Sequence, residues 1–246
     1  MSGVLQLKSL ETSVKVAVVA ALEREILPFV KDWPQIAREY DGRTFKFYEN
    51  AANVVVCGGI GAEAARRAAE AAIALYNPVL VISAGFAGAL DPALAVGQTL
   101  MPSQVIDALD GSRIHAESGE GILITFDSIA DVEQKSRFAK AFGAHAIDME
   151  AAAVARSAQA HGIKFLACKV ISDSSSSALP PLARFIGADG KFHGGRFFFY
   201  IALRPWKWGA VRRLARDSMK AAQALALSLE EQSRPRQALT MSGRDR

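Results

Sequence analysis

The sequence of 246 residues lacks several features that mark common classes of protein. No apolar run approaches the ~18 residues that a membrane-spanning helix needs, and residues 1–13 contain no apolar segment typical of an export signal. Cysteine occurs only at Cys57 and Cys168, each within an apolar stretch typical of a strand. This usage favours two reduced thiols over a disulfide, and we expect a cytoplasmic protein.

Histidine is also rare, and most of the chain has no excess of basic over acidic residues. The four histidines, at positions 115, 145, 161 and 193, have no spacing typical of metal ligands, so we expect no metal site. The net charge of +4 arises after residue 203, where ten Lys or Arg face four Asp or Glu. A basic excess confined to one end argues against a nucleic-acid-binding body.

What the sequence does contain is apolar strands alternating with helices, which predicts an α/β fold with a buried, largely parallel sheet. We expect a short extension at 1–13, one domain over 14–230 with an insertion at 178–208, and a basic, disordered tail over 231–246. A helix over 209–230 would bury a stripe that includes Ala215, Met219 and Leu225. Strands are predicted at 14–21, 44–49, 53–57, 79–85, 96–105, 121–127, 146–147 and 164–173, and the other helices at 22–30, 62–76, 131–142 and 149–162.

A glycine turn in VVVCGGIGAEAARR offers a dinucleotide-binding pattern in Gly59, Gly61 and Ala64. That fold also needs a carboxylate at the end of the next strand, to bind the ribose hydroxyls. Here that strand carries Ser83, and the first acidic residue after it is Asp91. A dinucleotide oxidoreductase is therefore the weakest of the functions considered.

Acidic residues follow three predicted strands: Glu23 and Glu25 after the first, Asp148 and Glu150 before an alanine-rich helix, and Asp173 after the last. Each set has a purely structural interpretation, as a helix cap, a turn or a charge beside a helix dipole. Ligands in open α/β sheets gather at the carboxyl ends of strands, so the three sets together predict one site.

Five segments carrying these residues occur in a characteristic order: VAVVAALEREI, VVVCGGIGAEAA, VISAGFAGAL, IDMEAAAVA and KVISD. Over residues 14–175 the chain resembles the purine nucleoside phosphorylase and methylthioadenosine/S-adenosylhomocysteine nucleosidase superfamily. The resemblance implies a three-layer α/β/α fold with a central mixed, largely parallel sheet. It further implies a homodimer that needs no cofactor and cleaves the N-glycosidic bond of a purine nucleoside.

The same resemblance implies roles for individual residues. Glu25 would activate the attacking water, and Asp173, supported by Ser172, would protonate the purine at N7. Met149 would contact the base and Glu150 the ribose diol. Protonation makes the purine a better leaving group, and a carboxylate near the sugar stabilises its oxocarbenium character.

Other positions shape the implied pocket. Ala87 and Gly88 would lie beside the nucleoside, Ile60 would face its 5′ group, and Phe126 would pack against the base. Two positions depart from the hydrolases of the family, which carry serine where this chain has Phe86 and arginine where it has Lys169.

The choice between water and phosphate as the nucleophile rests on a third position. Phosphorylase relatives carry arginine where this chain has Ser83, so its absence, with Glu25 kept, favours hydrolysis. Arg24 and Lys169 could still hold an anion, and phosphate would be a co-substrate if the reaction were phosphorolytic.

After Asp173 the chain is similar to the hopanoid-associated phosphorylase branch, through ALPP, a DG turn and an aromatic, basic segment. This implies adenosylhopane, an adenine nucleoside with a triterpenoid on C5′, as candidate substrate. The aromatic and basic composition of residues 197–213 has two interpretations. The segment either contacts the inner face of a membrane or forms a core strand that leads into the last helix. A methylthioadenosine/S-adenosylhomocysteine nucleosidase, a phosphorylase and a non-catalytic nucleoside sensor remain as alternatives.

Overall fold

The computed structural model describes residues 15–177, 182–185, 187, 190 and 208–233. The predicted extension at 1–13 lies outside the described residues. So do most of the insertion at 178–208, the aromatic part of the 197–213 segment and the tail from 234 onward.

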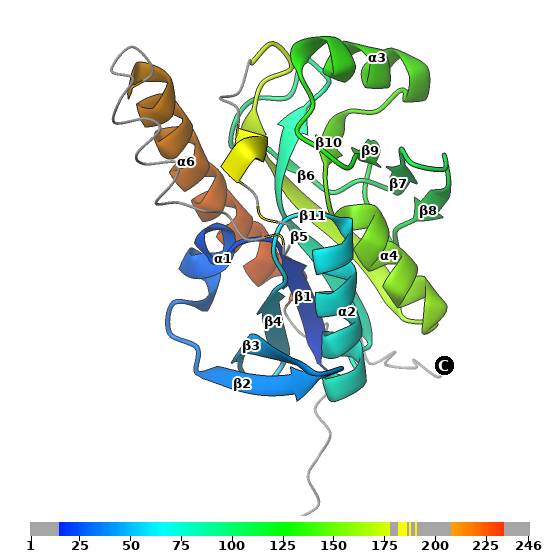
Figure 1. The fold of residues 1–246 in the computed structure, drawn as a ribbon, viewed down its shortest axis with the longest axis vertical. Helices are drawn as coiled ribbons and strands as arrows, with labels where there is room; N and C mark the ends of the chain where they lie inside the picture. The colour runs from blue at the N-terminus through cyan, green and yellow to red at the C-terminus, as the bar shows by residue number, and fades with distance from the viewer. Residues whose placement is uncertain (1–14, 178–181, 186, 188–189, 191–207, 234–246) are drawn as a thin grey trace, which may run out of the picture.

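The described chain contains both strands and helices, as the sequence predicts, but the alternation is interrupted over residues 35–57 and 80–125, where strands follow one another with no α-helix between them (Figure 1). The strands are β1 Val16–Ala20, β2 Gln35–Tyr40, β3 Arg43–Glu49, β4 Asn53–Cys57, β5 Leu80–Ala89, β6 Thr99–Leu100, β7 Gln104–Asp107, β8 Arg113–His115, β9 Ile122–Thr125, β10 Ala146–Asp148 and β11 Lys164–Asp173. The helices are α1 Glu23–Val30, α2 Ala62–Tyr76, α3 Val132–Phe142, α4 Ala151–Ala160 and α6 Trp208–Gln232, with one 3₁₀ turn at Leu182–Phe185.

The described strands form one mixed sheet of eleven strands, in the order β2-β3-β4-β1-β5-β10-β9-β7-β8, with β11 beside β5 and β6. Most of its central pairs are parallel, namely β4 with β1, β1 with β5, β5 with β11, and β10 with β9, whereas β5 with β10 is antiparallel. The outer pairs β2 with β3 and β7 with β8 are antiparallel. The expected mixed α/β fold is confirmed.

Strand β5 changes neighbours along its length, and this change creates space for a site. Strand β1 pairs with β5 as far as Ser83, and β10 begins to pair at Gly88. On the opposite edge, β11 stays paired with β5 throughout. The edge of β5 over residues 84–87 therefore faces neither β1 nor β10, at the point where β1 ends.

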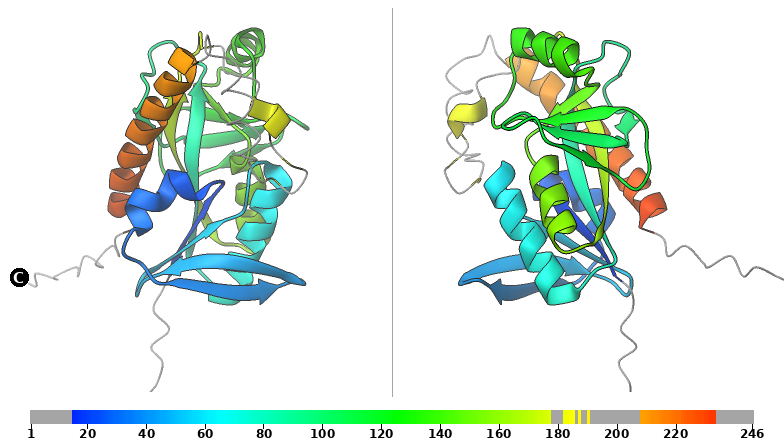
Figure 2. Two further views of the ribbon diagram at one scale, coloured as in Figure 1. Left: turned by 60° about the vertical axis from the view of Figure 1, so that its left-hand side comes forward. Right: turned by 90° about the vertical axis from the view of Figure 1, so that its right-hand side faces the viewer.

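Two pairs of helices cover the two faces of the sheet (Figures 1 and 2). Helices α2 and α4 pack together on one face, while α1 and α6 pack together on the other. The alanine-rich surface of α2 allows it to lie close to the backbone of the glycine turn. A Cβ atom at Gly58 would come within 2.7 Å of the Ala68 Cβ, so the turn serves close packing.

Helix α6 follows its predicted apolar stripe only in part. Leu225 is buried, in a face that also holds Ala221, Ala222, Ala226 and Leu229. Ala215 and Met219 are exposed, with Met219 64% accessible, and both line a cavity. Within the described residues, no helix combines the length and apolarity needed to cross a membrane.

Candidate active site

A cavity of about 890 Å³ lies beside the unpaired edge of β5. Every one of the three predicted acidic sets contributes to its lining, through Glu25, Glu150 and Asp173. The remaining lining residues come from α1, the glycine turn, β5, the segment before α3, Lys135 of α3, the β10–α4 connection and α6.

Glu25 lies in the first turn of α1, where the chain leaves β1. Its side chain is buried, and its Oε2 accepts a hydrogen bond from the backbone N–H of Leu22 at 3.3 Å. Burial raises the pKa of Glu25 to about 7, despite the opposing effects of the Leu22 hydrogen bond and the Lys169 ammonium. The carboxyl is therefore able to accept a proton near neutrality.

Glu150 caps the start of α4 and reaches the glycine turn. Its Oε1 accepts a hydrogen bond of 2.8 Å from the backbone N–H of Gly61. Burial raises the pKa of Glu150 to about 7, and the neighbouring Asp148 carboxylate adds to the rise. The glycine turn thus holds a carboxylate by its backbone N–H.

A buried polar network stands behind these two glutamates. The Lys169 Nζ lies 2.8 Å from Oδ2 of Asp148 and donates a hydrogen bond of 3.1 Å to Oγ of Ser83. Burial disfavours the Lys169 ammonium, but the carboxylates of Asp148, Glu150 and Glu25 outweigh it and raise its pKa. The network therefore keeps a cation behind the carboxyl cluster.

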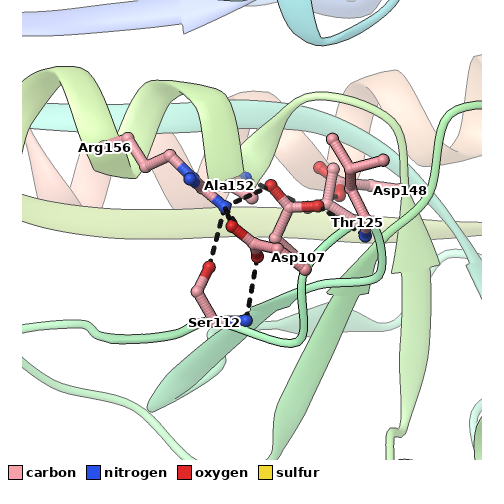
Figure 3. Close-up of polar contacts among 8 residues, drawn as sticks. Asp107, Ser112, Thr125, Asp148, Ala152 and Arg156 are labelled. Carbon is pink, nitrogen blue, oxygen red and sulfur yellow. Dashed lines mark hydrogen bonds and ion pairs between the residues drawn. The ribbon is translucent and has the colours of Figure 1, made fainter.

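The Asp148 carboxylate also fixes the start of α4 (Figure 3). Its Oδ1 accepts a hydrogen bond of 2.6 Å from Thr125 Oγ1, and its Oδ2 accepts one of 2.8 Å from the Ala151 N–H. Farther along α4, Arg156 reaches Asp107 at 2.7 Å and ties the helix to the end of β7. These contacts set the position of Glu150 at the head of the helix.

Asp173 ends β11 on the opposite side of the cavity. Its Oδ1 accepts a hydrogen bond of 2.8 Å from Ser172 Oγ, and its Oδ2 accepts one from the Lys135 ammonium. A Cβ atom at Gly88 would stand 3.1 Å from Asp173 Oδ2, so glycine leaves room for the carboxyl group.

The predicted site residues fall into two groups. The cavity is lined by Glu25, Ile60, Phe86, Ala87, Gly88, Met149, Glu150, Ser172 and Asp173. Lys169 lies behind that lining, in contact with Asp148. Phe126 lies outside the lining and packs against Phe138, with ring centroids 4.9 Å apart.

Sequence reasoning missed Lys135 and the linking role of Asp148. Lys135 shares one face of α3 with Phe138, Ala139 and Phe142, at helical spacings of three, four and seven residues. A lysine on an apolar helical stripe is the signal that would have identified it.

Exposed side chains of both kinds lie at the mouth of the cavity. Leu27 of α1 and Met219 of α6 are apolar and 51% and 64% exposed, and the exposed Arg24 and Lys31 line the same cavity. Ile129 and Ala222 extend the apolar surface inward. The site therefore combines a polar floor of acids and lysines with an entrance that carries apolar and basic side chains.

The fold and the three carboxyl groups together define an enzyme of nucleoside cleavage. The chain belongs to the Phosphorylase superfamily, whose family model matches residues 15–119 and 111–184. It is thus a member of a superfamily of nucleoside phosphorylases and nucleosidases.

Individual relatives are distant. The 5′-methylthioadenosine/S-adenosylhomocysteine nucleosidase of Staphylococcus aureus is 26% identical over 196 residues, covering 64% of this chain and 86% of that protein. The Neisseria meningitidis enzyme of the same name, in complex with methylthio-immucillin-A, is 20% identical with a TM-score of 0.66, covering 88% and 97% of the chains. Futalosine hydrolase of Helicobacter pylori is 19% identical with a TM-score of 0.64, covering 89% and 98%. The two structures establish the fold.

Proposed function

We propose that this protein hydrolyses the N-glycosidic bond of an adenine nucleoside that carries a large apolar 5′ substituent. The observation that carries the proposal is the convergence of Glu25, Glu150 and Asp173 on one cavity that has exposed apolar side chains at its mouth. Two carboxyl groups on opposite sides of a scissile glycosidic bond are the usual means of acid and base catalysis on sugars.

In the proposed reaction, Asp173 gives its proton to N7 of the purine as the bond between C1′ and N9 breaks. The electron pair of that bond leaves with the purine, and the sugar becomes oxocarbenium-like. Glu150, anchored at Gly61, accepts hydrogen bonds from the ribose diol and places negative charge beside the developing cation. Glu25 takes a proton from the water that adds to C1′.

The walls of the cavity suit the base and the sugar. Met149, Phe86 and Ala87 offer apolar contacts, and Ser172 holds the Asp173 carboxyl in place. The position of Phe86 in the lining favours it, in place of Phe126, as the aromatic neighbour of the base.

The charges around Glu25 favour water over phosphate. Glu25, Asp148 and Glu150 bring three carboxyl groups to that end of the cavity, and Lys169 is already paired with Asp148. Ser83, where phosphorylase relatives carry arginine, is occupied as the hydrogen-bond acceptor of Lys169. A phosphate dianion would meet like charge there, whereas a water molecule would meet a base.

The apolar side chains at the mouth support a 5′ substituent larger than methylthio. Leu27, Pro28 and Met219 give this substituent an apolar path from the site toward solvent. Beyond Asp173 the chain returns to the glycine turn, where Gly190 O accepts a hydrogen bond of 2.8 Å from the Ile60 N–H. Together with the resemblance of this segment to the hopanoid-associated branch, these features make adenosylhopane our candidate substrate.

A second candidate function has support from the Staphylococcus aureus relative, a 5′-methylthioadenosine/S-adenosylhomocysteine nucleosidase. The two candidates share the reaction and differ only in the 5′ group. A homodimer, and contact of the mouth with the inner face of a membrane, remain proposals that follow from the same family and the exposed Arg212, Arg216 and Lys220 of α6.

The test is to incubate the purified full chain with 5′-methylthioadenosine and with adenosylhopane, each with and without phosphate. Chromatography would measure adenine and the sugar product. We expect adenine without phosphate, and faster release from adenosylhopane. Release of no adenine from either nucleoside contradicts the proposal, and release only with phosphate replaces hydrolysis by phosphorolysis.

A further inference from the structure

Lys135 is a buried lysine whose ammonium group meets Asp173 inside the cavity. Its side chain is only 3% exposed, and its Nζ donates hydrogen bonds to Asp173 Oδ2 and, at 2.9 Å, to the backbone carbonyl of Ser174. Burying an ammonium group is costly unless it is paired and hydrogen-bonded, and here both conditions are met.

The helix that carries this lysine is held in a fixed position. Asp131 caps α3, accepting a hydrogen bond of 2.8 Å from the Gln134 N–H, while the Gln134 side chain accepts one of 2.9 Å from the Asp131 N–H. On the same face as Lys135, Phe138 packs against Phe126. The backbone of Lys135 thus lies in a capped first turn, and its side chain extends from a well-defined point.

Both side-chain oxygens of Asp173 accept hydrogen bonds. Ser172 holds Oδ1 and Lys135 holds Oδ2, while Gly88 leaves the space in front of the carboxyl group open. With both partners in place the carboxyl group has one orientation relative to the cavity. Without Lys135, Oδ2 would lose its charged partner and the group would be free to rotate.

We propose that Lys135 is a positioning residue for Asp173, because its ammonium group fixes the orientation of the Asp173 carboxyl group relative to N7 of the purine. The proposal rests on the proposed function. The step begins after Asp173 has taken a proton from solvent; its O–H bond then breaks, an N–H bond forms at N7, and the electrons of the C1′–N9 bond stay with the purine. The proton that Glu25 takes from water balances the one that Asp173 gives, and exchange with solvent restores both groups.

A purely structural role is the rival explanation, since Lys135 also ties α3 to the chain after β11 through the Ser174 carbonyl. That role would weaken the fold or the whole cavity without regard to N7. The two roles therefore differ in whether the effect of Lys135 requires Asp173 and the N7 atom.

The first test is a double-mutant cycle on kcat for adenine release, with Lys135→Met, Asp173→Asn and the double variant. We expect Lys135→Met to lower kcat roughly 10- to 100-fold, and to have almost no further effect in the Asp173→Asn background. Lys140→Met is the matched control, because Lys140 is an exposed lysine on the same helix. Independent, multiplicative effects of the two substitutions would overturn the proposal.

The second test is binding, which needs no turnover and separates this proposal from the proposed function. Calorimetry would compare adenine with 7-deazaadenine, which lacks the N7 acceptor. We expect the wild type and Lys140→Met to prefer adenine about tenfold, and Lys135→Met and Asp173→Ala to lose that preference. Lys135→Arg, which keeps the charge, should retain part of it.

The outcomes are distinct. If Lys135→Met keeps the wild-type preference for adenine, Lys135 does not position Asp173, whatever the protein's reaction. If the wild type shows the preference but releases no adenine from any nucleoside, the proposed function fails while the positioning of Asp173 stands. Thermal unfolding of Lys135→Met checks its fold, and if that variant is unfolded, Lys135→Arg carries the test. Retention of at least part of kcat and of the preference for adenine in Lys135→Arg supports the need for charge. Loss of both, despite a wild-type melting temperature, contradicts it.

Discussion

The two ends of the cavity hold carboxyl groups in opposite electrostatic surroundings. At one end Glu25, Asp148 and Glu150 face Lys169, so acids outnumber the ammonium group that contacts them. At the other end Asp173 pairs with Lys135 and is held by Ser172. The carboxyl groups at the two ends of the cavity therefore differ in the balance of negative and positive charges that surrounds them.

At the acid-rich end, burial raises the pKa of Glu25 and of Glu150 to about 7, and the Asp148 carboxylate adds to the rise at Glu150. A carboxyl group with such a pKa is a useful proton acceptor near neutrality. At the paired end, the Lys135 ammonium group and the Ser172 hydroxyl group hold the Asp173 carboxyl group in one orientation. In the proposed function the base lies at the first end and the proton donor at the second, and each prediction below breaks or sharpens this comparison.

The largest expected effect comes from removing either acid. Asp173→Asn and Glu25→Gln should each lower kcat for adenine release by roughly 10²- to 10⁴-fold, since each removes one proton transfer. Glu23→Gln and Asp127→Asn are matched controls, because both side chains are exposed. Wild-type rates in either acid variant would remove that residue from the mechanism.

Removing the ammonium group behind the glutamates should mainly destabilise the fold. Lys169→Met leaves Asp148 buried without its ion pair, and we expect a loss of about 3–5 kcal/mol in the free energy of unfolding. Lys164→Met, at the exposed start of the same strand, should change it by less than about 0.5 kcal/mol. Urea denaturation measures both, and equal stabilities would show that Lys169 is dispensable.

The raised pKa of Glu25 predicts a pH dependence of stability. Because the folded pKa of about 7 exceeds the ordinary value of 4.5, the neutral carboxyl stabilises the fold at low pH, and this is lost as pH rises toward and through 7. Relative to Glu25→Gln, the wild type should lose about 3 kcal/mol between pH 4 and pH 8. Parallel stability curves for the two proteins would mean that the pKa of Glu25 is not raised.

The smallest expected effect concerns the mouth. Met219→Asp should lower kcat/KM about tenfold for a nucleoside with a long apolar 5′ group, while leaving 5′-methylthioadenosine nearly unaffected. Leu227→Asp is the control, since Leu227 is 69% exposed on the same helix and lies outside the cavity lining. An equal loss on both nucleosides would contradict a role for Met219 in recognising the 5′ group.

Local signals predicted part of the fold accurately. Helix α2 and strand β11 have the predicted bounds, because Asn77-Pro78 stops the helix and a continuous apolar run defines the strand. Strand β2 was missed because nearly all its side chains are exposed. The predicted strand over 96–105 is wrong as one element: β6 and β7 lie on either side of Pro102 and pair with different strands.

The candidate site was predictable where motif and strand end coincide, as at Glu25, Glu150 and Asp173. Helix α4 begins two residues later than predicted, at Ala151, whose N–H donates to the Asp148 carboxylate, while Glu150 before it accepts a hydrogen bond from Gly61. Lys135 and Asp173 are 38 positions apart in the sequence, and the packing of α3 brings their side chains into contact. Contacts of this kind arise from tertiary structure and leave little trace in a local pattern.

The most direct test of the central claim is to cleave an adenine nucleoside in water enriched in oxygen-18 and to determine the mass of the sugar product. With Glu25 activating water, we predict one oxygen-18 atom in the released sugar, at a rate that rises with pH through about 7 and is unaffected by phosphate. A sugar phosphate without oxygen-18, formed only when phosphate is present, would contradict the account.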